Sequence, residues 1–321
     1  MISCLELAAL CGVSHGTVDR AMHGRAGVSA ATRARILAMA EAHGYRPNPA
    51  AREMMGRAVS TVVGVAVPSR TLSQPFFMDL FGVLARHLQG AGLQLCLWVT
   101  PEDTAGMEEV VTTMAARRLR ALLLVGPPPN LHLTPALLQA QPVIALNLPC
   151  VLPQVRTLMP DEFAVGRVAT EHLIALGHRR IVHLMGDLEL HPVRLRRRDG
   201  YLAAMATAAL ESRVWPLAAT APGLIERLQH EGITAVFCHH DPMAIVVLQR
   251  LAEAGIRVPD AISIVGVDHS PILAAISPGL TSVAYPYEAI AAQVIGVIAG
   301  QEPGALPTPQ LVMGRTSGPC P

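Results

Sequence analysis

The sequence has few of the features that mark exported, membrane or disulfide-stabilised proteins. Its six cysteines are scattered and none forms a C-x-x-C pair, so neither a zinc site nor a disulfide framework is expected. No stretch approaches the roughly 20 consecutive apolar residues that would span a bilayer. The first residues include Glu6 and lack the basic segment and apolar run of a secretion signal. We therefore expect a soluble, cytoplasmic protein with no membrane partner.

The motifs of common enzyme classes are missing as well. The sequence has no Gly-rich phosphate loop, no G-x-S-x-G and no metal-spaced cluster of His, Cys, Asp or Glu. We therefore expect no catalytic residues, no metal and no cofactor. At 321 residues, with 51% hydrophobic and 15% charged residues, the chain is long enough for a small module plus one large or two medium α/β units.

Charge is distributed unevenly along the chain, and lysine is absent from it. The net charge is only +1, but the first 57 residues hold seven arginines against four acids, and the remainder holds eighteen against twenty. A small basic module is thus joined to a faintly acidic body. This distribution predicts that the N-terminal segment meets phosphates and that the rest does not.

The N-terminal segment begins with two local helix signals. Ser3 and Glu6 have the spacing of a capping box, which predicts a helix that stops at Gly12, where a residue free to take positive φ allows a tight turn. Ser14 then caps a second helix, from His15 to about His23, with Val18 among its inward residues.

A third helix is expected from Ser29 to Gly44. Three short helices with a Gly turn between the first two predict an all-α helix-turn-helix module over residues 1–46, whose second helix fits the major groove of double-stranded DNA. Residues 47–60 contain two prolines and a stretch too short to form a stable helix alone in water. This hinge helix and linker would need a partner or DNA to form.

Three motifs carry a resemblance to a known family. They are Cys11-Gly12-Val13-Ser14-x-x-Thr17-Val18, Val28-Ser29-x-x-Thr32-Arg33 and Gly44-Tyr45-Arg46-Pro47-Asn48-x-x-Ala51-Arg52. In order and spacing the chain resembles the LacI/GalR family of bacterial repressors, and the similarity extends over nearly its full length. The resemblance implies a homodimer on a palindromic operator, with one recognition helix in each half-site and a pair of hinge helices that open the minor groove.

The resemblance also implies which residues contact DNA: Ser14, His15, Gly16, Thr17, Arg20, His23, Tyr45, Asn48, Ala51, Arg52 and Met54. Arg20 is the best candidate for a bidentate contact to guanine, and Met54 stands where an apolar wedge, usually leucine, kinks the central base step. Asp19 stands where serine is usual; a carboxylate there repels phosphate or accepts a hydrogen bond from cytosine. A merely solvated helix face remains the alternative for the residues of the second helix.

From Thr61 onward, short apolar runs alternate with helical stretches, as in βαβ units with a parallel sheet. The expected strands are 62–67, 93–98, 121–125, 143–146, 181–185, 235–238 and 262–267, and the clearest helices are 78–89, 163–176 and 242–254. The pattern recurs on both sides of residue 160, which indicates two similar lobes. By resemblance, residues 61–321 form a two-lobed periplasmic-binding-protein-like (type I) α/β domain for effector binding and dimerisation. Its first lobe would hold about 61–160 plus 286–321, and its second about 161–285.

Ligands of open α/β sheets bind beyond the carboxyl ends of the strands. The residues that we expect around an effector are Phe76, Phe77, Asn147, Asp161, Arg197, His240, Asp241, Asp268 and Tyr285. The family implies cleft positions for Arg197 and Asp268, and an acid opposite an arginine suits vicinal hydroxyls. The two phenylalanines either stack on a ligand or pack at a helix start. His239 and His240 raise the possibility of a metal, but no third ligand is evident.

These observations favour a sequence-specific DNA-binding transcriptional regulator, a repressor, whose operator affinity is controlled by a small polar effector, sugar-like or nucleoside-like, between two lobes. The alternatives are a cytoplasmic sugar-binding protein and a sugar-acting enzyme, neither of which binds DNA. Both leave the helix-turn-helix without a role. Closure of the lobes around the effector would move the Thr61 ends of the two subunits and so change how the hinge helices pair. The sequence is compatible both with an effector that releases DNA and with one that promotes DNA binding.

Overall fold

The computed structural model describes residues 2–46, 60–128, 130–148, 150, 152, 154–185, 192–216, 218–277 and 279–321. The chain divides into two compact units, Met1–Ser60 and Thr61–Pro321. Most of the expected hinge, and with it Asn48, Ala51, Arg52 and Met54, lies outside the described residues. Within the described ranges, no helix is long and apolar enough to cross a membrane.

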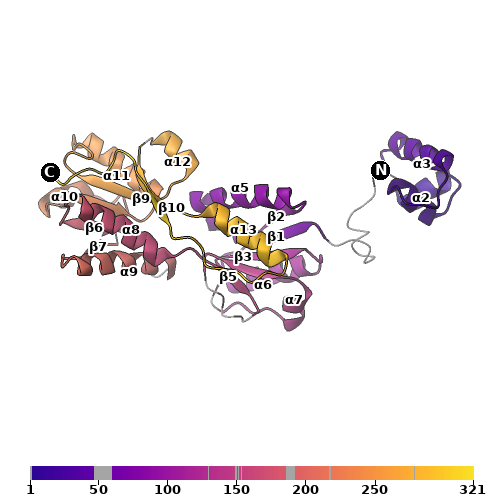
Figure 1. Ribbon diagram of the computed structural model, residues 1–321, viewed down its shortest axis with the longest axis horizontal. Helices are drawn as coiled ribbons and strands as arrows, with labels where there is room; N and C mark the ends of the chain where they lie inside the picture. The colour runs from indigo at the N-terminus through magenta and orange to yellow at the C-terminus, as the bar shows by residue number, and fades with distance from the viewer. Residues whose placement is uncertain are drawn as a thin grey trace. The chain divides into compact units, whose positions relative to one another are not determined.

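The first unit is the expected three-helix module, with α1 (Cys4–Leu10), α2 (His15–Met22) and α3 (Ala30–Ala42) (Figure 1). The capping box is confirmed, because the Ser3 amide donates to Glu6 Oε2 at 2.7 Å and the Glu6 amide donates to Ser3 Oγ at 3.2 Å. Each helix contributes an apolar side chain to one small core, in which Leu7, Val18 and Ile36 are fully buried. Local capping and one shared core therefore account for this unit.

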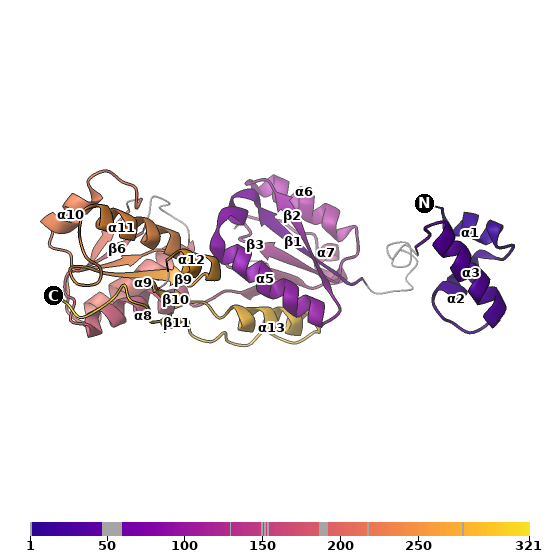
Figure 2. The same cartoon turned by 90° about the horizontal axis from the view of Figure 1, so that it is seen from above.

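The first lobe of the second unit is a parallel five-stranded sheet with the order β2-β1-β3-β4-β5. Its strands are β1 (Val62–Pro68), β2 (Gln94–Thr100), β3 (Ala121–Val125), β4 (Val143–Leu146) and β5 (Arg156–Leu158). One face packs against α5 (Pro75–Gly90) and α13 (Tyr287–Ile298), which lie side by side (Figure 2). The other face packs against α6 (Thr104–Ala115) and α7 (Pro135–Ala140), and a 3-10 turn, η1 (Ser69–Ser73), precedes α5.

The second lobe is a six-stranded sheet with the order β11-β10-β9-β8-β6-β7, parallel except for β11. Its strands are β6 (Ile181–Leu184), β7 (Arg213–Trp215), β8 (Ala235–Cys238), β9 (Ser263–Asp268), β10 (Thr281–Ala284) and β11 (Gln310–Val312). One face packs against α8 (Glu162–Ala175) and α9 (Pro192–Thr207), and the other against α10 (Leu224–His230) and α11 (Asp241–Glu253). A short helix, α12 (Pro271–Ile276), follows β9.

All seven expected strands are confirmed, with ends shifted by at most two residues. Four further strands, β5, β7, β10 and β11, were not expected. Each is only three or four residues long. Three residues, the length of β5, β7 and β11, are too few for a hydrophobic period to be recognised, and β10 begins with the polar residues Thr281 and Ser282.

The predicted course of the C-terminal segment was wrong in part. Helix α13 belongs to the first lobe, as expected, but β11 pairs antiparallel with β10 in the second lobe. The chain then stays there: the Ile264 amide donates to the Thr316 carbonyl at 2.7 Å, and the Cys320 amide donates to the Leu176 carbonyl at 2.9 Å. The physical reason is that the outer edge of β10 and the first amides of β9 need hydrogen-bond partners, which this last segment supplies.

Candidate functional site

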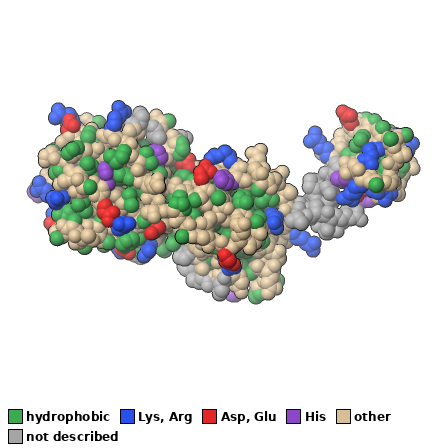
Figure 3. Space-filling view, in the orientation of Figure 1, with side chains coloured by type: hydrophobic (Ala, Val, Ile, Leu, Met, Phe, Trp, Pro, Cys, Tyr) green, Lys and Arg blue, Asp and Glu red, His purple; other side chains and the backbone are tan. Residues whose placement is uncertain are grey.

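Four of the residues expected to contact DNA, His15, Gly16, Thr17 and Arg20, lie on α2, and Ser14 precedes the helix. Ser14 caps the helix by accepting from the Thr17 amide at 3.2 Å, and the two hydroxyls lie 2.9 Å apart. Arg20 is exposed and donates from Nη2 to Thr17 Oγ1 at 3.3 Å, while His15 is also exposed and Gly16 is half-buried. Figure 3 shows several basic side chains on the visible face of this unit. The face is therefore polar and basic, with its apolar side turned to the core.

Asp19 is engaged within the headpiece. Its Oδ2 accepts from Arg25 Nη1 at 3.1 Å, and its Oδ1 lies 3.2 Å from His23 Nδ1. The same His23 nitrogen lies 2.8 Å from the Asp19 carbonyl oxygen. Tyr45 is half-buried and packs against the core of the unit, and burial raises the pKa of its hydroxyl. The structure thus gives Asp19, His23 and Tyr45 contacts inside the module that the sequence did not reveal.

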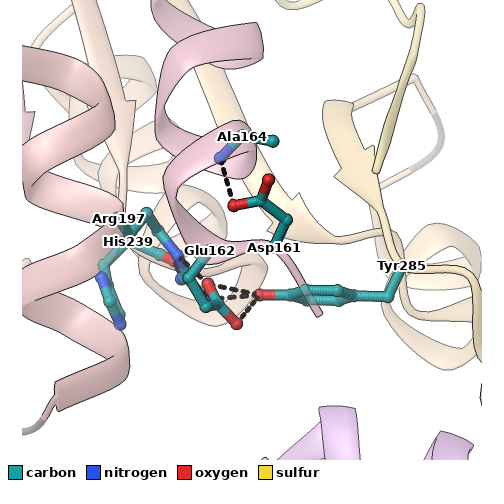
Figure 4. A network of polar contacts seen from close by, with 6 residues as sticks. All are labelled: Asp161, Glu162, Ala164, Arg197, His239 and Tyr285. Atoms are coloured by element: carbon teal, nitrogen blue, oxygen red, sulfur yellow. Dashed lines mark hydrogen bonds and ion pairs between the residues drawn. The ribbon is translucent and has the colours of Figure 1, made fainter. Parts of the chain in front are cut away.

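A buried polar network lies where the second lobe begins (Figure 4). Arg197 on α9 donates to Glu162 Oε2 on α8, from Nε at 3.0 Å and from Nη2 at 2.8 Å. Nη2 also donates to the Tyr285 hydroxyl at 2.5 Å, and Nη1 donates to the His239 carbonyl. The Tyr285 hydroxyl in turn donates to the Glu162 carboxylate at 2.9 Å. The Arg197 and Glu162 side chains are 5% and 1% exposed, so each charge depends on the other for compensation.

The charge of Arg197 is fixed by these neighbours. Burial alone would lower its pKa, but the adjacent Glu162 carboxylate and the Tyr285 hydroxyl more than offset this, so that its pKa is raised. Two histidines nearby contribute no positive charge. Burial lowers the pKa of His183 to about 3 and that of His240 to about 4. The network is therefore a single ion pair surrounded by neutral groups.

Two glycines allow the helices that carry this ion pair to touch. A Cβ at Gly166 on α8 would lie 1.9 Å from the Arg197 carbonyl oxygen, and one at Gly200 on α9 would lie 2.0 Å from the Phe163 carbonyl oxygen. Both obstacles are backbone atoms, which cannot rotate away. Close backbone packing of α8 and α9 thus brings Glu162 within hydrogen-bond distance of Arg197.

Replacing Gly200 with alanine is expected to lower the free energy of unfolding by about 3 kcal/mol, because the helices must separate to admit a methyl group. Urea denaturation followed by circular dichroism measures this change. The matched control is Gly82→Ala in α5, where a Cβ meets nothing within 4 Å. That variant should be neutral or slightly more stable. Equal stability of the two variants would contradict the close packing.

His240 and Asp241 sit at the start of α11. His240 caps the helix, its Nδ1 accepting from the Met243 amide at 3.0 Å. Asp241 is buried and accepts from the Ser282 hydroxyl at 2.6 Å and from the Ser270 amide at 3.3 Å. Burial nevertheless raises the pKa of Asp241 to about 6. Both residues are therefore bound to their own lobe.

This pKa predicts how stability varies with pH. A raised pKa in the folded protein means that the protonated acid favours folding, so the contribution of Asp241 is complete below the ordinary value of 3.8 and is lost as the pH rises through about 6. Relative to the wild type, Asp241→Asn should become more stable by up to ~3 kcal/mol between about pH 4 and pH 7.5. Urea denaturation across this range measures the difference. A difference that does not change with pH would contradict the raised pKa, and the exposed Asp260→Asn serves as control.

A cavity of about 280 Å³ lies between the two lobes. The first lobe contributes α5 and the start of α13 to its wall, and the second lobe contributes the end of β10 and the β9–α12 connection. Its lining residues are Met78, Asp79, Gly82, Val83, Arg86, Asp268, His269, Pro271, Ala284, Tyr285 and Tyr287. Asp268 and Tyr285 are the two predicted effector residues among them. A second cavity, of about 400 Å³, lies on the second lobe near α10 and α11 and includes none of the predicted residues.

The other predicted effector residues are not among those that line the inter-lobe cavity. Phe76 and Phe77 are buried, with ring centroids 4.9 Å apart, and Phe76 packs on Tyr285 at 4.8 Å. Asn147 takes a positive φ of 66° after β4, and its Oδ1 is buried without a partner among the described residues. Asp161 caps α8 by accepting from the Ala164 amide at 3.0 Å (Figure 4). Of these four, only Asn147 has a buried polar atom still available to a ligand.

Sequence reasoning missed Glu162, Asp79 and Tyr287. An acid directly after a helix cap normally faces solvent and interacts with the helix dipole, so nothing local signals that Glu162 is buried. Its partner, Arg197, is distant in the sequence. Asp79 lies in the second turn of α5 and Tyr287 at the start of α13, and only the assembly of the two lobes shows that both line the cavity.

Comparison with known proteins finds matches to both the three-helix unit and the two-lobed unit. The family model described as bacterial regulatory proteins, lacI family, matches residues 5–48, and the model of a periplasmic binding protein-like domain matches residues 170–314. The HTH-type transcriptional regulator CelR of Thermobifida fusca is 30% identical over 301 residues, which are 88% of this chain and 86% of that protein. The chain belongs to the LacI family. The HTH-type transcriptional regulator AscG of Escherichia coli (strain K12) is similar at 28% identity, over 92% of this chain and 90% of that protein.

Solved LacI-family structures share the fold. The lac repressor dimer bound to operator and the anti-inducer ONPF matches with a TM-score of 0.80 at 23% identity, over 99% of each chain. A CelR–cellobiose complex matches with a TM-score of 0.65 at 26% identity, over 98% of this chain and all of that one. This LacI-family protein is thus a DNA-binding transcriptional regulator, with a helix-turn-helix headpiece and a two-lobed effector-binding unit.

Proposed function

We propose that this LacI-family regulator is a cytoplasmic repressor that binds a palindromic operator as a homodimer. Its affinity for the operator is controlled by a small polar effector, sugar-like or nucleoside-like, held between the lobes. The names of relatives support this class of effector, since one solved relative is a CelR–cellobiose complex and another relative is the repressor PurR of Photobacterium profundum. We propose no catalytic role, because the buried Arg197 and Glu162 neutralise each other.

The single observation that carries the proposal is the inter-lobe cavity with Asp268 and Tyr285 on its wall. Asp268 ends β9 and Tyr285 lies between β10 and α13, where the second lobe meets the first. A ligand that contacts both them and α5 binds the closed arrangement of lobes better than an open one. The chain enters β1 of the first lobe directly from the hinge. Closure therefore changes the geometry from which two hinges of a dimer would start.

For DNA contact we propose the exposed face of α2, with Arg20 reading a guanine and Ser14, His15, Gly16 and Thr17 beside it. His23 and Tyr45 act by holding the module together as well as by lying near the phosphates. The expected hinge contributes Asn48, Ala51, Arg52 and Met54 in the minor groove.

Selection of bound duplexes from a random-sequence pool tests this function with the full-length protein. The proposal expects enrichment of a palindrome whose half-sites are about one helical turn apart or less. Binding to the selected duplex should exceed binding to a scrambled duplex by at least ~10³-fold at physiological salt. Recovery of no palindromic sequence would contradict the proposed function.

A further inference from the structure

The inter-lobe cavity contains acidic groups that lack partners. Asp268 is only 6% exposed, and no hydrogen bond from a described residue reaches its carboxylate. Asp79, on the opposite lobe, has its Oδ2 buried with no partner among the described residues. The Tyr287 hydroxyl is buried in the same way. The buried atoms of Asp79 and Tyr287, with the Asp268 carboxylate on the same cavity wall, therefore point to a ligand that satisfies them, because buried polar atoms in native proteins are normally hydrogen-bonded.

The positive charges near the cavity are already matched. Arg197 is bound to Glu162 and makes no hydrogen bond to Asp79 or Asp268, although its charge lowers the pKa of Asp268. Arg86, at the rim, is exposed and pairs with Glu288 Oε1 at 3.1 Å. Burial keeps His239 and His240 neutral by lowering the pKa of both rings. Among the described residues, no cation is hydrogen-bonded to Asp79 or Asp268 on the cavity wall, and Arg197 acts on Asp268 only at longer range.

The remaining wall is aromatic. Tyr285 and Tyr287 line the cavity with ring centroids 6.0 Å apart, and Phe76 packs behind both rings. Aromatic faces attract cations through their quadrupole, and this attraction is strongest where water is excluded. Carboxylates with aromatic rings beside them form an environment that favours an ammonium group over a neutral hydroxyl group.

We propose that the effector of this regulator carries an ammonium group, which Asp79 and Asp268 bind across the inter-lobe cavity beside Tyr285 and Tyr287. The inference rests on the proposed effector-controlled function and names the chemical class of that effector. A volume of about 280 Å³ limits the ligand to a small compound, such as an amino sugar or a short aliphatic amine. Because the two acids come from different lobes, the ammonium group bridges the lobes and stabilises their closed arrangement.

Binding of an ammonium group is also expected to release a proton from the cavity. Burial raises the pKa of Asp268, with Asp79, Glu162 and Asp241 raising it further and Arg197 acting against them. His269 also lines the cavity. The empty site therefore retains a proton on Asp268 more readily than an exposed aspartate does. A cation beside the carboxylate favours its ionised form, so an amine expels this proton and a neutral polyol does not.

Pairs of compounds in which one or two amines replace hydroxyl groups test the proposal on the full-length protein. D-glucosamine is compared with D-glucose, D-galactosamine with D-galactose, and putrescine with 1,4-butanediol, by isothermal titration at about pH 6.5, where all the amines are charged. In at least one pair, the amine should bind more tightly than its hydroxyl counterpart by about tenfold or more. The pair that responds distinguishes an amino sugar from an aliphatic amine. Repeating the titration in two buffers of different ionisation enthalpy should show net proton release for that amine alone.

Variants assign the effect to the cavity. Asp79→Asn and Asp268→Asn should each weaken binding of the amine by at least about tenfold, and the second should abolish proton release. Asp260→Asn removes an exposed acid that is 63% accessible and pairs with Arg257, and it should leave binding unchanged. Proton release by the wild-type protein remains decisive even if one variant fails to fold.

The results separate this inference from the proposed function. If no amine in the panel binds more tightly than its hydroxyl counterpart, or if Asp79→Asn folds and binds the amine as the wild type does, the ammonium proposal is wrong. Neutral sugars that change operator affinity, while the amines do not, would reject it and leave the regulator intact. Tight amine binding by a protein that selects no palindrome would support the cavity chemistry and reject the proposed function.

Discussion

Replacing Arg197 with methionine is expected to lower the free energy of unfolding by about 3–5 kcal/mol. Methionine fills much of the same volume, so the loss comes from electrostatics rather than from a cavity. Glu162 is 1% exposed, and among the described residues the variant leaves its carboxylate with the Tyr285 hydroxyl alone as a side-chain donor. A buried charge without a counter-charge is strongly destabilising. Urea denaturation at neutral pH measures the change.

Two further variants distinguish this mechanism from a general effect of substitution. The double variant Arg197→Met with Glu162→Gln removes both charges and should recover most of the lost stability. Arg198→Met removes a neighbouring arginine that is 34% exposed and pairs with Asp199, and it should cost no more than about 0.5 kcal/mol. If the double variant were as unstable as the single one, the buried ion pair would not be the cause.

Replacing Arg20 with alanine is expected to weaken binding to the selected palindrome by about 10- to 100-fold per half-site contact. This range lies within the ~1–3 kcal/mol of discrimination that a bidentate contact to guanine provides. Arg20 is exposed on α2, and among the described residues its side chain is hydrogen-bonded only to Thr17 Oγ1, at 3.3 Å, so the headpiece should fold without it. Fluorescence anisotropy with labelled duplexes measures the effect.

The charge-conserving variant Arg20→Lys separates base reading from attraction to phosphate. Lysine retains the positive charge but lacks the planar fork of donors, so binding to scrambled DNA should persist while the preference for the palindrome falls. Equal loss of binding to the palindrome and to scrambled DNA in both variants would show that Arg20 contacts phosphate rather than a base.

Local signals made the headpiece predictable. Ser3, Ser14 and Ser29 each cap a helix by a bond to the amide three residues later, so a short stretch of sequence contains the whole interaction. The long buried strands of the α/β unit were predictable for a similar reason. The short strands β5, β7 and β10 and the return of β11 to the second lobe were not, because they depend on pairing with residues far away in the sequence.

The same distinction applies to the effector site. Asp268 was expected because it follows a predicted strand, and Tyr285 was expected because it lies where the chain crosses between the lobes. Both residues line the inter-lobe cavity. Glu162 and Asp79 were not expected. The burial of Glu162 depends on Arg197, and the cavity position of Asp79 depends on the approach of the opposite lobe. The sequence also left open whether Phe76 stacks on a ligand or packs in the core, and its contact with Tyr285 shows that it packs.

The most direct test of the account is a titration of the selected palindrome with full-length protein, with and without a saturating amount of the compound that binds the cavity. Coupling between the sites predicts a change in DNA affinity of at least ~5-fold, in either direction. By reciprocity, DNA should change the affinity for the compound by the same factor. Identical DNA affinity with the cavity empty and filled would contradict the claim that occupancy of the inter-lobe cavity controls the headpieces.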